Sequence, residues 1–457
     1  MHLDIKKYNH IYMVGIGGIS MSGIAEILVK WGYQVSGSDG TKSSQTDWLE
    51  ENGVKVNIGQ ISDNITKDID LVVYTAAIKE DNPELVRARE LNIPTVERGE
   101  FLGEITKLYK DTIGIAGTHG KTTTTSMVAC AFLEANLDPS IQVGAVLNNI
   151  NGNYRVGHSE YFIIEACEYC ESYLNFKQRS AIVLNIDNDH LDYFGNIDNI
   201  EKSFQKYVSN LPEDGFLIVN VDDERCYNLR LHTKANVISV GSGANADWWY
   251  ENLEFNDEGC PSYDAFYKGE NKGRIELKVT GIHNVMNSLS CIALCTAYGI
   301  DLDTIAKALL KFGGASRRLE YKGDFNGAKV YDDYGHHPTE IMATVRGLKN
   351  KKFNESWVVF EAHTYSRFAE HLKDFAKALV NFDHVVIMDT YAAREVNTYN
   401  IHEEDLIEEL KKLGKESIHI SDYDEIVKYL GDRVKKGDVI LTLGAGNVTK
   451  IASLLTK

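Results

Sequence analysis

The chain lacks the features that place a protein in a membrane or on nucleic acid. It has no uninterrupted apolar run that approaches the roughly 20 residues of a membrane-spanning helix. The N-terminal segment, which reaches Lys6 and Lys7, has no apolar core of a signal peptide. A net charge of −18 at pH 7 disfavours nucleic acid and anionic membranes as general partners. We therefore expect a cytoplasmic protein with no nucleic-acid partner and no membrane insertion.

Cysteine is scarce and forms no framework. Seven cysteines are scattered over 457 residues, and in a cytosolic chain most cysteines are small buried side chains. Cys167 and Cys170 have the spacing of a metal-binding pair, but no second pair follows at the distance of a zinc ribbon. We therefore expect no structural zinc. The remaining composition, 43% hydrophobic and 25% charged, is typical of a soluble protein with two to four domains.

The most informative stretch, residues 111–125, is an apolar run that breaks into glycines, a lysine and a series of threonines. It predicts a strand, a turn at Gly117 and Gly120, and a helix that opens at Lys121. Glycine allows the turn to point backbone N–H groups and the helix dipole at an anion, whatever the net charge of the protein. Although Ile115 stands where a phosphate-binding loop has its first glycine, the Gly-Lys-Thr corner predicts a phosphate site.

In such a loop, Lys121 contacts the terminal phosphates and Thr122 offers its hydroxyl group to Mg²⁺. One alternative is an ordinary strand-turn-helix corner with a surface lysine. Another is a nucleotide switch that uses only this loop, although the chain has no N-K-x-D motif to read a guanine base.

A second glycine-rich turn lies near the N-terminus. A predicted strand at residues 11–14 runs into Gly15-Ile-Gly-Gly18 and an amphipathic helix, which is how a Rossmann-like unit opens. The next strand ends at Ser38 and Asp39, where a dinucleotide fold places the acidic residue that meets a ribose. Ser20 replaces the third glycine of the dinucleotide pattern, which weakens an NAD assignment. An NAD-linked oxidoreductase nevertheless stays open as an alternative.

Strands alternate with helices along the chain and predict an α/β protein of three domains. We expect a Rossmann-like N-terminal domain over 1–108 and a central P-loop ATPase-like domain with a mostly parallel sheet over 109–314. A C-terminal Rossmann-like α/β domain follows over 315–457. Within the central domain, residues 248–279 alternate in short segments and predict an antiparallel insertion.

Short motifs in all three domains carry a resemblance to a known family. They are Gly117-Thr-His-Gly-Lys-Thr-Thr123, Glu165-Ala-Cys-Glu-Tyr169, Asn185-Ile-Asp-Asn-Asp-His190, His283-Asn-Val-Met-Asn287, Arg317-Arg318 and Asp332-Asp-Tyr-Gly-His-His-Pro338. Together they resemble the Mur ligase family, which builds the peptide stem of peptidoglycan. The segments 14–23 and 363–367 further resemble the members that join L-alanine to UDP-N-acetylmuramate. Related tripeptide-recycling ligases share much of this pattern, and folylpolyglutamate synthetases share its middle part.

The resemblance implies that ATP phosphorylates a substrate carboxylate and that an amine then attacks the acyl phosphate. This chemistry needs charge stabilisation on the transferring group. The residues implied at ATP are Gly117, Thr118, His119, Gly120, Lys121, Thr122, Thr123, His283, Asn284, Asn287, Arg318 and Asp333. Those implied in catalysis are Lys121, Glu165, His190, Arg318 and His336. Those implied at Mg²⁺ are Thr122, Glu165 and His190.

The resemblance also implies two small-molecule substrates, UDP-N-acetylmuramate and L-alanine, and it specifies no oligomeric state. The first domain would bind the UDP moiety through Gly15, Gly17 and Gly18 at the diphosphate, with Ser38 and Asp39 near the nucleoside. The third would bind the amino acid through Tyr334, His363 and Arg367, where glycine or serine would also be physically acceptable.

Several of these residues have an ordinary structural alternative. From spacing alone His190 is a hydrogen-bonded loop histidine, and Asn284 is a helix N-cap. The charges that follow Gly313 and Gly314 are equally a solvated linker or the start of a domain that closes on a hinge. Lys202 lies near the position of a carbamylated lysine that several family members carry and the alanine-adding members lack.

Overall fold

The computed structural model describes residues 4–75, 77–150, 152–393 and 395–457. The chain forms two compact units. Unit 1 comprises Met1–Gly241, Asn245–Trp248 and Ser290–Ala308, and unit 2 comprises Ser242–Ala244, Trp249–Leu289 and Leu309–Lys457. Within the described residues, no helix is both long and apolar enough to cross a membrane.

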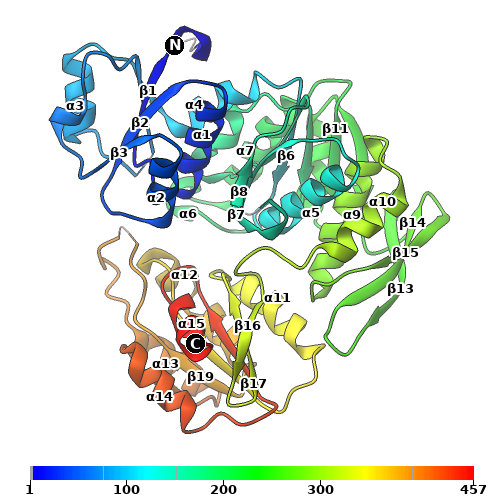
Figure 1. The fold of residues 1–457 in the computed structure, drawn as a ribbon. Helices are drawn as coiled ribbons and strands as arrows, with labels where there is room; N and C mark the ends of the chain where they lie inside the picture. The colour runs from blue at the N-terminus through cyan, green and yellow to red at the C-terminus, as the bar shows by residue number, and fades with distance from the viewer. Residues whose placement is uncertain (1–3, 76, 151, 394) are drawn as a thin grey trace. The chain divides into compact units, whose positions relative to one another are not determined.

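The N-terminal part of unit 1 is a parallel sheet with strand order β3-β2-β1-β4-β5 (Figure 1). Its strands are β1 (His10–Val14), β2 (Gln34–Asp39), β3 (Lys55–Ile58), β4 (Leu71–Tyr74) and β5 (Thr95–Glu97). Its helices are α1 (Ile19–Lys30), α2 (Ser44–Glu51), α3 (Pro83–Glu90) and α4 (Arg98–Thr106). The first strand is fully buried because both sheet faces are covered, as is usual for parallel sheets.

The central part of unit 1 has the strand order β12-β11-β10-β6-β9-β7-β8, parallel except for the β7–β8 pair. Its strands are β6 (Asp111–Ala116), β7 (Ser140–Leu147), β8 (Gly152–Arg155), β9 (Tyr161–Glu165), β10 (Ser180–Val183), β11 (Phe216–Asn220) and β12 (Asn236–Val240). Its helices are α5 (Lys121–Glu134), α6 (Leu191–Phe194), α7 (Ile197–Ser209) and α8 (Glu224–Asn228), with a 3-10 segment η4 (Tyr169–Asn175).

One hydrophobic core joins the two sheets of unit 1. Met21 and Ile24 of α1 belong to the same buried cluster as Phe162 and Ile164 of β9. Helix α1 also passes so close to β8 that a Cβ atom on Gly23 would lie 1.8 Å from the ring of Tyr154. Only glycine fits this crossing, and the N-terminal sheet is therefore packed firmly on the central one.

Unit 2 contains a three-stranded segment, which belongs to the ten-stranded sheet of the chain, and a sheet of its own. The strand β13 (Trp248–Phe255) and the antiparallel pair of β14 (Pro261–Tyr267) and β15 (Glu270–Glu276) confirm the antiparallel insertion predicted from the sequence. The second sheet has the order β16-β17-β21-β18-β19-β20 and is parallel except for the β16–β17 pair. Its strands are β16 (Glu320–Phe325), β17 (Ala328–Asp333), β18 (Ser356–Phe360), β19 (His384–Ile387), β20 (Ser417–His419) and β21 (Val439–Leu443).

The helices of unit 2 are α11 (Pro338–Lys349), α12 (Tyr365–Leu379), α13 (Glu403–Lys412), α14 (Tyr423–Gly431) and α15 (Thr449–Leu455), and the chain passes between the units within α9 (Ile282–Ala297) and α10 (Leu302–Lys311). The α/β class predicted from the alternating pattern is confirmed, with three sheet regions along the chain.

Candidate functional site

The loop between β6 and α5 has the backbone that its glycines predict. Gly117 has φ +129° and Gly120 has φ +87°, and Gly120 is the left-handed N-cap of α5. A Cβ atom on Gly117 would lie 3.0 Å from the backbone nitrogen of Leu184. Both positions therefore require glycine, and the helix begins at Lys121 as predicted from the sequence.

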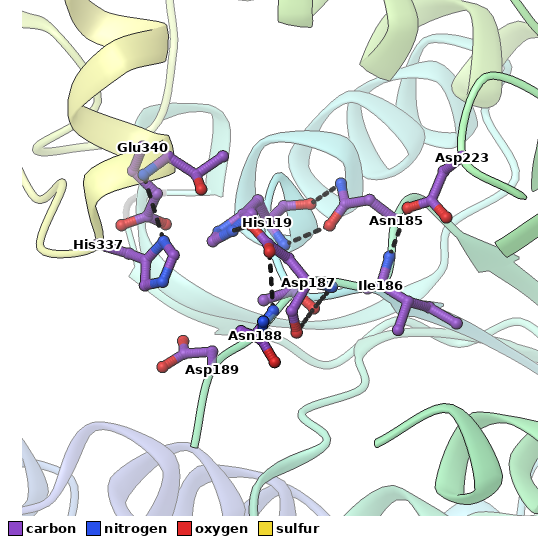
Figure 2. A network of polar contacts seen from close by, with 12 residues as sticks. His119, Asn185, Ile186, Asp187, Asn188, Asp189, Asp223, His337 and Glu340 are labelled. Atoms are coloured by element: carbon purple, nitrogen blue, oxygen red, sulfur yellow. Dashed lines mark hydrogen bonds and ion pairs between the residues drawn. The ribbon is translucent and has the colours of Figure 1, made fainter. Parts of the chain in front are cut away.

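The segment after β10 holds this loop in place (Figure 2). The backbone N–H of His119 donates to Asn185 Oδ1 at 2.8 Å, and Asn185 Nδ2 returns a bond to the carbonyl oxygen of His119 at 3.0 Å. The N–H of Asp187 donates to Thr118 Oγ1 at 2.9 Å, and Asp187 Oδ2 lies 3.0 Å from His119 Nε2. The sequence motif contained Asn185 and Asp187, but reasoning from the sequence assigned them no role.

Lys121 points back into the loop. Its ammonium group donates to the carbonyl oxygens of Gly117 at 2.6 Å and Thr118 at 2.9 Å, and it lies 2.9 Å from Glu168 Oε2. Burial has the largest single effect and lowers the pKa of Lys121, but the charge and hydrogen bond of Glu168 together with the neighbouring Cys167 and Glu165 outweigh it, and the pKa is raised overall. The lysine is therefore held as a cation at the loop, as a phosphate-binding role requires.

Oxygen donors meet beside the loop at the end of β9. Thr122 Oγ1 donates to Glu165 Oε1 at 3.0 Å, and the N–H of Gly144 donates to Glu165 Oε2 at 2.6 Å. A hydroxyl and a carboxylate oxygen at this separation are the hard donors that Mg²⁺ prefers. The structure thus brings together two of the three residues that the sequence assigned to the metal.

The third of these residues, His190, lies on the loop that follows β10. It is the left-handed N-cap of α6 with φ +54°, an unusual conformation for a non-glycine residue. Its ring centroid is 4.7 Å from that of Tyr169, and its Nε2 is 3.8 Å from Asp189 Oδ2. These contacts fix the orientation of the imidazole.

The N-terminal glycine turn has its own carboxylate. Gly15 has φ +81°, and the N–H of Gly17 donates to Asp39 Oδ2 at 2.9 Å. Ser38 donates to Glu84 Oε2 at 2.6 Å and is fully buried. In this structure Ser38 and Asp39 thus bond to their own domain, and Gly18 precedes the first turn of α1 as its N-cap.

In unit 2, two buried amides lie on the first turns of α9. Asn287 Nδ2 donates to Asn284 Oδ1 at 3.0 Å, and Asn284 Nδ2 donates to the carbonyl oxygen of Thr280 at 2.8 Å. His283 precedes them on the helix and is exposed.

A second group of predicted residues follows β17. Asp333 is buried and accepts the N–H groups of Leu319 and Gly335, both at 2.7 Å. Burial raises the pKa of Asp333 to about 6, although the charge of Arg318 opposes the shift. Glu340, which the sequence did not indicate, lies 3.7 Å from Arg318.

Four aromatic and cationic residues form a chain of contacts in the same unit. The His336 ring lies 5.3 Å from that of Tyr334 and 5.6 Å from that of His363. The guanidinium of Arg367 lies 3.3 Å from His363 Nδ1. The structure therefore gathers the amino-acid-binding residues that the sequence predicted, together with His336.

A strand, a left-handed glycine loop and a helix that opens with Lys-Thr define a P-loop nucleotide-binding protein. Comparison with family models then places the whole chain. Residues 10–110 match the Mur ligase family catalytic domain, residues 115–295 the Mur ligase middle domain, and residues 317–446 the Mur ligase glutamate ligase domain. The chain belongs to the Mur ligase family.

Its relatives are similar over their full length. The UDP-N-acetylmuramate--L-alanine ligase of Acetivibrio thermocellus is 44% identical, with 100% of this chain and 97% of the relative covered. The ligase of the same name from Agathobacter rectalis is 46% identical, with 100% and 99% covered. The crystal structure of UDP-N-acetylmuramate-alanine ligase from Thermotoga maritima aligns with a TM-score of 0.84 at 29% identity, covering 98% of both chains.

Proposed function

We propose that this chain is an ATP-dependent ligase that joins L-alanine to the carboxylate of UDP-N-acetylmuramate in peptidoglycan precursor synthesis. The observation that carries the proposal is full-length identity of 44% to 46% with relatives that bear this name. The loop with Lys121, beside the oxygen donors of Thr122 and Glu165, supports the ATP-dependent part. In this role the enzyme works in the cytoplasm, with the domain boundaries 1–108, 109–314 and 315–457.

The loop residues hold ATP and the metal. Gly117 to Thr123 surround the phosphates, and Lys121 neutralises charge on the terminal phosphate as it transfers to the substrate carboxylate. Thr122 and Glu165 would hold Mg²⁺, with His190 at a second metal position. The ion would neutralise phosphate charge during transfer.

Unit 2 carries the other residues that we assign to the nucleotide. The amides of Asn284 and Asn287 carry both donors and acceptors, which suits the edge of a base, and His283 lies beside them. Arg318 contacts the transferring phosphate, and Asp333 accepts from the ribose.

The two other substrates have separate binding residues. Gly15, Gly17 and Gly18 bind the UDP diphosphate at the start of α1, where the helix dipole favours an anion. Arg367 pairs with the carboxylate of L-alanine, because a guanidinium group binds a carboxylate through two parallel hydrogen bonds. Tyr334, His336 and His363 line the same pocket.

An ADP-release assay over a panel of amino acids tests this function. ADP is expected only when both UDP-N-acetylmuramate and an amino acid are present, with L-alanine preferred. Preference for L-alanyl-γ-D-glutamyl-diaminopimelate would make the chain a tripeptide-recycling ligase. ADP release that ignores UDP-N-acetylmuramate would overturn the proposal.

A further inference from the structure

Glu168 is a buried carboxylate that the proposed chemistry does not use. It lies three residues after Glu165, next to η4, and its side chain is only 3% exposed. Both of its oxygens approach the ammonium nitrogen of Lys121, at 3.0 Å and 2.9 Å. A carboxylate this deeply buried is stable only while a cation or several donors accompany it.

Lys121 distributes its three protons over three partners. An ammonium group has three N–H donors, and they face the carbonyl oxygens of Gly117 and Thr118 and the carboxylate of Glu168. A phosphate oxygen can therefore reach Lys121 only by displacing one of these acceptors.

The displaced acceptors are the carbonyl oxygens. A loop carbonyl can turn to another donor at a cost of about one ordinary hydrogen bond. Separating Lys121 from Glu168 would instead leave a buried charge without its counter-ion, which costs several times more. Glu168 therefore stays paired with the ammonium nitrogen when a triphosphate enters.

We propose that Glu168 is a positioning residue that fixes the ammonium group of Lys121 for phosphoryl transfer, an inference that rests on the proposed ATP-dependent function. The carboxylate acts through Lys121 and contacts no reacting atom. It sets where the cation lies while the charge of the terminal phosphate redistributes.

This role predicts that the loss of Glu168 lowers the turnover rate but does not weaken ATP binding. In Glu168→Gln the amide keeps the size of the side chain and one acceptor, but it loses the charge that anchors the lysine. A misplaced catalytic group lowers kcat by about 100-fold. Affinity for ATP does not weaken, because the negative charge that is removed repels the triphosphate.

The test compares full-length variants in two measurements. The first is kcat for ADP release with UDP-N-acetylmuramate and L-alanine, and the second is the Kd of a non-hydrolysable ATP analogue with Mg²⁺, by calorimetry. We expect Glu168→Gln to lower kcat by about 100-fold with an unchanged or lower Kd. Glu168→Asp keeps the charge and should recover part of kcat; it carries the same test if Glu168→Gln does not fold.

Glu171→Gln is the matched control. Glu171 lies in η4 and pairs with Lys206 at 3.4 Å, so its replacement removes the same charge from the same segment. Both constants should stay within about twofold of the parent protein. A Glu168→Gln kcat equally close to the parent would overturn the inference, and so would a Kd that rises as much as kcat falls. An unmodified protein that releases no ADP with any substrate pair would instead overturn the proposed function.

Discussion

At the scale of single residues, we expect the pair formed by Lys121 and Glu168 to link the stability of the protein to its catalysis. Removing the cation alone strands a carboxylate that is 3% exposed. We expect Lys121→Met to lower the free energy of unfolding by about 3 to 5 kcal/mol and to abolish ADP formation. The double variant Lys121→Met/Glu168→Gln should recover the stability but not the activity. Thermal unfolding and ADP release measure the two effects, and a double variant no more stable than the single one would contradict this account.

Glu165 provides a second test at this scale. Its oxygens accept from Thr122 and Gly144, so glutamine keeps the shape but loses the charge that a Mg²⁺ ligand supplies. The Mg²⁺ concentration for half-maximal ADP release should rise by about tenfold or more, and the maximal rate should fall. Glu160→Gln, at an exposed pair with Lys110, is the control. An unchanged Mg²⁺ titration would mean that Glu165 only ends its strand.

The raised pKa of Asp333 predicts how the free energy of unfolding changes with pH. Its pKa is raised from 3.8 to about 6 in the folded protein, so between these values the folded state binds more protons than the unfolded state. The stabilisation is complete below about pH 4 and is lost as the pH rises through about 6. The loss amounts to about 3 kcal/mol. The unfolding free energy of the parent protein, measured from pH 4 to 7, should fall relative to that of Asp333→Asn, and parallel curves would refute the assignment.

At the scale of elements, the glycine turns were predictable and their partners were not. The breaks after Ala116 and Val14 mark strand ends because glycine interrupts an apolar run at a defined residue. The contacts of His119 with Asn185 and of Lys121 with Glu168 join segments 66 and 47 residues apart. Such pairs form only where tertiary packing brings distant segments together, and no local sequence pattern encodes that packing. The bond from the Gly17 N–H to Asp39 was missed for the same reason.

The close crossing of α1 over β8 leads to a further prediction at this scale. A methyl group on Gly23 would lie 1.8 Å from the Tyr154 ring, so Gly23→Ala should destabilise the protein by about 1 to 3 kcal/mol despite the higher helix propensity of alanine. Gly431→Ala in α14 is the matched control, because the nearest atom would lie 3.7 Å away. We expect it to be neutral or stabilising. Equal melting temperatures for the two variants would show that α1 and β8 can move apart at little cost.

At the scale of the whole molecule, the sequence predicts three domains, and the chain forms two compact units that divide residues 109–314 between them. In unit 1 the two sheets share a core, because α1 and β9 contribute to one hydrophobic cluster. The alternation of strands and helices in the sequence reveals each sheet but not which sheets share a core. Sheets with a shared core and sheets with separate cores produce the same local pattern. The three family models, which cover 10–110, 115–295 and 317–446, reflect the sheets and not the shared core.

In the proposed function, the choice of amino acid is the property of the whole enzyme that rests on unit 2. Arg367 lies in α12 beside His363, and a carboxylate that loses its guanidinium partner binds more weakly by about 2 to 5 kcal/mol. Arg367→Ala should therefore raise the KM for L-alanine at least about 30-fold and leave the Kd of ATP unchanged. Arg367→Lys should recover only part of the loss, because an ammonium group lacks the two-pronged geometry. Lys373→Ala, an exposed position on the same helix, is the control. In the parent protein, glycine should react less efficiently than L-alanine by about 10-fold to 200-fold, the value of one methyl-sized contact. An Arg367→Ala enzyme with the parent KM for L-alanine would place the amino-acid carboxylate elsewhere in the protein.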